Sequence, residues 1–162
     1  MDRWNPVARE LDLLIESGRF QDVDASTRQD RFLEAAWPHL NRHGVSWAGF
    51  YLEAPDQPED ARLVMGPSRG GPACSPIGLH GACGAAYLAK QPLVVRDVKE
   101  LGDEYIACDP RDRSEVIIPV WSARRVIGVL DLDSHEIGAF EEQDARLAAD
   151  LMTRAGIDSR KS

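Results

Sequence analysis

Val126-Ile127-Gly128-Val129-Leu130-Asp131-Leu132-Asp133 predicts a β-strand with two different faces. Successive side chains of a strand point to opposite sides, so the even-numbered residues 128–132 form an apolar face. The odd-numbered residues form the other face, which includes Asp131 and Asp133. Two carboxylates two positions apart then lie about 6–7 Å from one another on one side of a sheet.

The segments around this strand show the same period of two. Glu115 shares a face with Ile117, and Trp47 shares a face with Tyr51. We expect strands over 45–52, 62–65, 93–95, 115–120 and 125–133.

Helices are predicted at both ends of the chain and once in the middle. Asn5 is expected to cap a first helix that stops near Gly18, and residues 26–29 resemble a capping box that starts a second helix. Pro38 is expected to end or kink that helix. A short helix over 82–90 and a closing helix from 140–142 onward complete the set.

The chain contains no repeat, linker or low-complexity segment, which favours a single α/β (α+β) domain over residues 1–162. Residues 1–44 hold the N-terminal helices, and residues 45–158 hold the sheet, the loops and the closing helix. Two long loops, 66–81 and 96–114, carry Cys74 and Cys108. Loops of this length are uncommon in compact domains and are often functional.

The composition excludes several classes of protein. Of 162 residues, 43% are hydrophobic and 28% are charged, which is typical of a soluble globular protein. The formal net charge of −8 argues against general binding to nucleic acid or to an anionic membrane. No segment reaches the ~20 apolar residues of a membrane span, and no signal peptide is visible, so we expect a cytoplasmic location.

The acidic residues on the strands allow two interpretations. They can decorate the solvated face of a half-buried sheet, which is the common arrangement for any single acid. Alternatively, with aromatic residues and two long loops nearby, they can line a pocket for a small cationic or zwitterionic ligand. Clustered carboxylates in such a pocket would hold protons and could donate them.

Three cysteines leave buried thiols, a metal site and a redox pair as alternatives. Eight and 24 residues separate them in turn, and the histidines are scattered, which argues against zinc. Cys83 is predicted at the start of a helix, where the dipole lowers a thiol pKa. Local charge alone therefore ranks Cys83 above Cys108 as the reactive thiol.

A recognisable pattern extends over residues 45–52, 71–74, 82–86, 106–109, 114–120, 126–134 and 140–144. Through these segments nearly the whole chain resembles the free methionine-(R)-sulfoxide reductases, which are single GAF domains with a central antiparallel sheet flanked by helices. This sequence has Tyr105 where the family usually has His, and one residue fewer between Ile77 and Cys83.

The resemblance implies a role for each cysteine. Cys108 matches the nucleophile, which attacks the sulfoxide sulfur and becomes a sulfenic acid. Cys74 matches the resolving cysteine, which closes a Cys74–Cys108 disulfide, so the two Cα atoms should lie within ~7 Å. Cys83 matches an auxiliary thiol. Electrons would come from NADPH through thioredoxin, without a metal or an organic cofactor.

The resemblance also implies a substrate site. Glu115, Asp131 and Asp133 match acids that bind the ammonium group of free methionine-(R)-sulfoxide and help to protonate its oxygen. Trp47 and Tyr51 match the aromatic wall around the S-methyl end. Homodimers are common in the family.

Two other readings stay open from the sequence. Most GAF domains sense small molecules, so a sensor without catalysis is the main alternative. A scaffold that has lost activity and only dimerises is the other.

Overall fold

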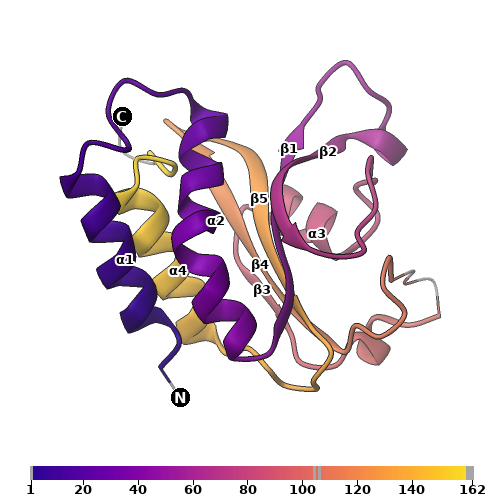
Figure 1. Ribbon diagram of the computed structural model, residues 1–162. Helices are drawn as coiled ribbons and strands as arrows, with labels where there is room; N and C mark the ends of the chain where they lie inside the picture. Colours follow the sequence, from indigo (N-terminus) through magenta and orange to yellow (C-terminus); the bar gives the residue numbers. More distant parts are fainter. Residues whose placement is uncertain (1, 104, 106, 160–162) are drawn as a thin grey trace.

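A computed structural model describes residues 2–103, 105 and 107–159 (Figure 1). It contains a five-stranded sheet with the order β2-β1-β5-β4-β3, in which every neighbouring pair is antiparallel. The strands are β1 (Val45–Glu53), β2 (Leu63–Gly70), β3 (Leu93–Val95), β4 (Ser114–Ser122) and β5 (Arg125–Ser134). The helices are α1 (Trp4–Glu16), α2 (Ala25–Arg42), α3 (Ala82–Ala89) and α4 (Glu142–Arg154), with short 3-10 turns η1 (Glu59–Ala61) and η2 (Val98–Leu101). The antiparallel sheet flanked by helices is therefore confirmed.

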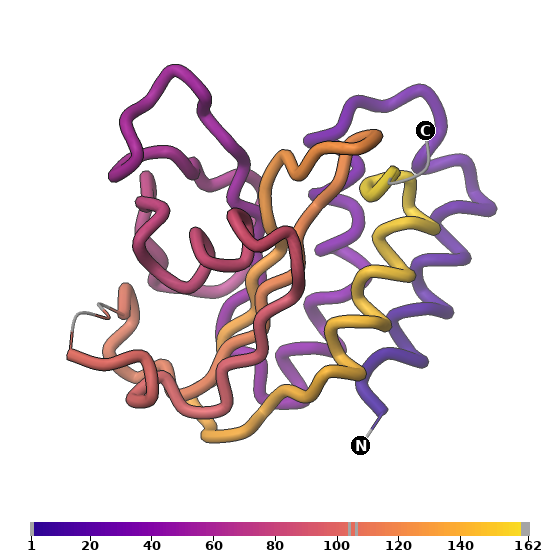
Figure 2. Tube along the Cα trace, turned by 180° about the vertical axis from the view of Figure 1, so that it is seen from behind, coloured from indigo at the N-terminus to yellow at the C-terminus, as the bar shows by residue number. Residues whose placement is uncertain are grey.

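The helices form two unequal layers. Helices α1, α2 and α4 lie together on one side of the sheet, and α3 lies on the other side with the long loops (Figures 1 and 2). Among the described residues, no helix is both long enough and apolar enough to cross a membrane.

The main core lies between the sheet and the three-helix layer. Leu130 and Leu132 of β5 point into it, and the rings of Phe32 and Phe50 meet edge to face with centroids 6.2 Å apart. The predicted apolar face of residues 128–132 is therefore confirmed. The opposite face of the sheet carries a smaller apolar cluster, which includes Tyr51, Ile117 and Val129.

The predicted starts of the first two helices were wrong by one or two residues. In α1 the Asp2 carboxylate, rather than Asn5, accepts the first backbone N–H groups. In α2 the cap is Asp24, whose carboxylate accepts from Thr27 N at 2.8 Å, ahead of the predicted box over 26–29. The negative charge of the Asp24 side chain also interacts favourably with the positive end of the helix dipole.

Helix α2 and strand β2 both extend further along the chain than the sequence predicted. Helix α2 runs through Pro38 to Arg42, because neighbouring packing of Leu33, Ala36 and Leu40 holds its last turn on the sheet. Strand β2 continues past residue 65 to Gly70, where it pairs with Trp47 of β1. The loop that carries Cys74 is correspondingly shorter than the predicted 66–81.

Strands β1 and β5 approach each other closely at Gly128. A Cβ at this position would collide with the carbonyl oxygen of Tyr51 and lie 3.0 Å from the Cα of Leu52. Because both are backbone atoms, Gly128→Ala should lower the free energy of unfolding by about 1–3 kcal/mol in urea denaturation. Gly81→Ala, whose Cβ would meet nothing within 4 Å, should change it by about 0.5 kcal/mol or less. Equal effects of the two variants would contradict the close approach.

Candidate active site

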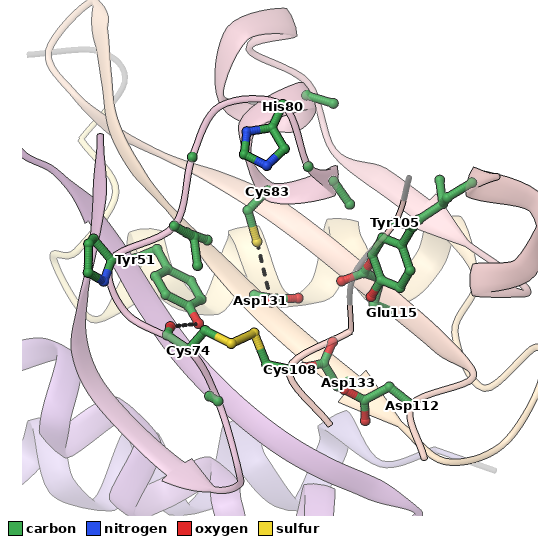
Figure 3. Close-up of a pocket in the computed structure, with 18 of the residues that line it drawn as sticks. Tyr51, Cys74, His80, Cys83, Tyr105, Cys108, Asp112, Glu115, Asp131 and Asp133 are labelled. Carbon is green, nitrogen blue, oxygen red and sulfur yellow. Dashed lines mark hydrogen bonds between the residues drawn. A yellow bond between two sulfur atoms is a disulfide. The ribbon is translucent and has the colours of Figure 1, made fainter. Parts of the chain in front are cut away.

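A cavity of about 510 Å³ opens on the face of the sheet that α3 covers (Figure 3). Its walls come from β1, β4, β5, the first turn of α3 and the two long loops. Seven of the eight residues singled out from the sequence border it: Tyr51, Cys74, Cys83, Cys108, Glu115, Asp131 and Asp133. Trp47 lies outside this set.

Cys74 and Cys108 form a disulfide that borders the cavity. Cys74 belongs to the loop after β2 and Cys108 to the loop before β4, and their Cα atoms are 5.5 Å apart. The predicted pairing is thus confirmed. Cys74 is exposed and Cys108 is half-buried, so the two sulfurs differ in access.

Three carboxylates converge on the floor of the cavity. The register of β4 on β5 places Glu115 opposite Asp133 and Ile117 opposite Asp131. Glu115 is 4% exposed and Asp131 is 5% exposed, so the interpretation of these acids as a solvated surface is wrong. Helix α3 and the loops cover this face. Within the described residues, one oxygen each of Glu115 and Asp131 is buried without a hydrogen-bond partner.

Burial controls the ionisation of this cluster. It raises the pKa of the Glu115 carboxyl to about 7, although hydrogen bonds with Asp133 and Tyr105 oppose the shift. Burial and then the charge of Glu115 raise the pKa of Asp131 well above its usual range. Burial and then Asp131 do the same for the pKa of Asp133. The cluster therefore retains protons at neutral pH.

Cys83 is a buried free thiol at the first turn of α3. Its Sγ donates a hydrogen bond to Oδ2 of Asp131 at 3.3 Å (Figure 3). Burial, followed by the charges of Asp131 and Glu115, raises the pKa of the Cys83 thiol well above its usual range. The prediction that the helix dipole lowers the pKa of the Cys83 thiol was wrong, because desolvation and nearby carboxylates outweigh the dipole.

Tyr51 forms the aromatic wall of the cavity. Its ring packs against Trp47 with centroids 5.5 Å apart, and Trp47 is only 2% exposed behind it. The Tyr51 hydroxyl donates to the backbone carbonyl oxygen of Cys74 at 2.7 Å. The two predicted aromatic residues are thus together, with Tyr51 in contact with the cavity.

Sequence reasoning assigned no site role to His80, Tyr105 or Asp112, which also line the cavity. Tyr105 precedes Cys108 by three residues, and burial raises the pKa of its hydroxyl, so it stays protonated. Burial, followed by the charge of Asp109, raises the pKa of Asp112 to about 6. For Tyr105, the only signal in the sequence was its position near Cys108. Ile106, in the same run, lies outside the described residues.

Two carboxylate-rich groups have ligand atoms close enough to hold a metal ion. One consists of Glu115, Asp131 and Asp133; the other consists of Asp109, Asp112 and His135. In the second group Asp109 is already hydrogen-bonded to Arg111 and to His135, and these bonds hold its pKa below the usual range. Its carboxylate is therefore neutralised by protein groups.

Comparison with known proteins places the chain among related sequences and structures. Residues 23–157 match the GAF domain profile. The chain is 41% identical over 102 residues to the free methionine-R-sulfoxide reductase of Escherichia coli. The matched segment covers 62% of this chain and 58% of that protein. It is 39% identical over 104 residues to protein YtsP of Bacillus subtilis, with 63% and 61% covered. The matches thus span about three fifths of the length of these curated relatives.

Solved structures share the fold over more of the chain. The substrate complex of free methionine-R-sulfoxide reductase from Neisseria meningitidis has a TM-score of 0.79 and 30% identity, and the match covers 96% of this chain and 89% of that one. A putative GAF sensor protein from Burkholderia vietnamiensis has a TM-score of 0.76 and 31% identity, with 98% and 93% covered.

The buried acids should make stability depend on pH. The pKa of Glu115 is about 7 in the folded chain against 4.5 for an ordinary glutamate. Between these values the folded chain holds a proton that the unfolded chain has released, so the free energy of unfolding falls as pH rises. Glu115→Gln removes this contribution. We expect the variant to exceed the parent in stability at pH 7.5, by on the order of 2 kcal/mol, and to match it near pH 4.

The measurement is urea denaturation across this pH window. Glu16→Gln, at an exposed position of α1, serves as the control and should run parallel to the parent. A Glu115→Gln profile parallel to the parent would show that Glu115 ionises alike in both states.

Proposed function

Because this chain belongs to the GAF domain family, and within it to the free methionine-(R)-sulfoxide reductases, we propose that it reduces free L-methionine-(R)-sulfoxide to L-methionine. One observation carries the proposal: the Cys74–Cys108 disulfide and the acid cluster of Glu115, Asp131 and Asp133 border the same cavity. A redox pair beside buried acids matches the needs of sulfoxide reduction.

The cavity suits a free amino acid. An α-ammonium is a compact cation with three donors, and the partnerless oxygens of Glu115 and Asp131 are acceptors that it would satisfy. Its positive charge also favours ionised carboxylates, so binding should release protons from the cluster. Tyr51 then offers an apolar surface to the S-methyl group. A methionine within a peptide has no free ammonium for these acids.

The proposed reaction begins with the reduced thiols. Cys108 attacks the sulfoxide sulfur, and the oxygen passes to Sγ of Cys108, which leaves methionine and a sulfenic acid. The oxygen is a poor leaving group unless it is protonated, and the acid cluster holds protons at neutral pH. Cys74 then attacks Sγ of Cys108, water departs and the disulfide closes.

Regeneration in this proposal uses an external dithiol. A thioredoxin-type protein, supplied with electrons from NADPH, would exchange with the Cys74–Cys108 disulfide and return both thiols. The exposure of Cys74 supports access by a protein reductant. No metal or organic cofactor enters this cycle, and a reducing compartment such as the cytoplasm would sustain it. A homodimer stays a prediction from the family.

A sensor without catalysis is the second candidate, supported by the likeness to the putative GAF sensor protein. A sensor without catalysis would not need a disulfide beside the cavity. The two candidates differ in turnover, which a direct assay measures.

Thioredoxin-coupled NADPH oxidation on resolved free (R)- and (S)-methionine sulfoxide tests the proposal. We expect turnover with the (R) form alone. Cys108→Ser should reduce it to background because the nucleophile is lost. Cys83→Ser should keep most of it, since a serine hydroxyl can still donate to Asp131.

Two outcomes would contradict these assignments. Loss of turnover in Cys83→Ser with retention in Cys108→Ser would move the nucleophile to Cys83. A folded, fully reduced chain that turns over neither isomer would favour the sensor.

A further inference from the structure

The hydroxyl group of Tyr51 links the sheet to the loop of the disulfide. Tyr51 is 3% exposed in β1, and Trp47 fixes its ring from behind. At the outer end of the ring, Oη donates to the carbonyl oxygen of Cys74 at 2.7 Å (Figure 3). A rigid side chain of the cavity wall therefore holds the backbone of one redox cysteine.

Residues 71–74 have few other attachments. Strand β2 ends at Gly70, and the next ties come after Cys74, where Met65 N donates to Ser75 Oγ at 3.0 Å. Further along, Ile77 pairs with Leu63 of β2. In the described part of the chain, no hydrogen bond other than that of Tyr51 joins residues 71–74 to the sheet. Apart from the disulfide and the packing of Ala73 on the smaller apolar cluster, this hydroxyl is therefore what attaches the backbone at Cys74 to the sheet.

The hydroxyl is a permanent donor. Burial, followed by the charge of Asp131, raises the pKa of Tyr51 far above its usual range, so the phenol keeps its proton where thiols ionise. A backbone carbonyl can only accept. The link between Tyr51 and Cys74 therefore persists across the pH range in which thiol exchange takes place.

We propose that the Tyr51 hydroxyl positions Cys74 for closure of the disulfide, a role distinct from that of the ring as a wall for substrate. The inference rests on the proposed function. In the closing step, the Cys74 thiolate attacks Sγ of the Cys108 sulfenic acid, the S–O bond breaks and hydroxide leaves as water after protonation. The rate depends on how often the Cys74 sulfur lies in line with that bond. Formation of the sulfenic acid does not involve Cys74.

Tyr51→Phe separates the two steps, because it keeps the ring and removes only the hydroxyl. Pre-reduced chain is mixed with one equivalent of free methionine-(R)-sulfoxide, and the methionine released and the disulfide formed are followed by quenched mass spectrometry. We expect disulfide closure to slow roughly tenfold more than methionine release, as for the loss of one hydrogen bond. A 1,3-dione reagent should then capture the Cys108 sulfenic acid in the variant.

Tyr87→Phe is the matched control. The Tyr87 hydroxyl also makes a partly buried hydrogen bond, to Glu53 Oε2 at 2.8 Å, but Tyr87 does not border the cavity. Both steps should match the parent in this variant. Closure at the parental rate in Tyr51→Phe would overturn the proposal. Equal slowing of both steps would also overturn it, because the hydroxyl would then act in substrate reduction.

A second measurement needs no substrate. The fraction of Cys74–Cys108 disulfide is measured at equilibrium in glutathione buffers of graded composition. Tyr51→Phe should lower the equilibrium constant for disulfide formation by about tenfold, because the hydrogen bond holds the oxidised geometry. An unchanged constant would overturn the positioning role. Failure of the parent to release methionine would instead count against the proposed function, and this equilibrium would still decide the role of Tyr51.

Discussion

The pairing of β4 with β5 is the constraint on which the site depends. Because side chains alternate with a period of exactly two residues, a slip of one residue would exchange the faces of a whole strand. The observed register keeps Leu130 and Leu132 in the main core. It thereby commits Glu115, Asp131 and Asp133 to the opposite face, under α3 and the loops. The acids are buried as a consequence of where the leucines must lie.

Burial of three acids is tolerable because they need not all be charged. Desolvation favours the protonated forms, so the cavity avoids the repulsion of three neighbouring carboxylates. The protons on these acids are available for transfer to the sulfoxide oxygen in the proposed reaction. A carboxylate that has lost its proton is suited to bind an ammonium group. One electrostatic arrangement thus serves folding and the proposed chemistry. The disulfide borders this cavity, and the Tyr51 hydroxyl donates to the carbonyl oxygen of Cys74.

Features set by neighbours in the sequence could be predicted, whereas features set by contacts between distant residues could not. Strand alternation is local, so the common face of Glu115 with Ile117 and of Asp131 with Asp133 was predictable from spacing alone. The partnership of Cys74 with Cys108 was not, because 34 residues separate them, and it came from the family resemblance. The electrostatics of Cys83 were mispredicted for the same reason, since Asp131 lies 48 positions away in the chain.

The hydrogen bond between Cys83 and Asp131 has a consequence for survival under oxidants. Peroxides attack thiolates, and a buried thiol with a raised pKa offers almost none. Cys83 should therefore react slowly with hydrogen peroxide, although it is the one cysteine outside the disulfide. A third thiol that stays neutral also cannot readily scramble the Cys74–Cys108 bond, because exchange requires a thiolate. Of the three cysteines, the buried Cys83 is thus the one best protected from permanent oxidation.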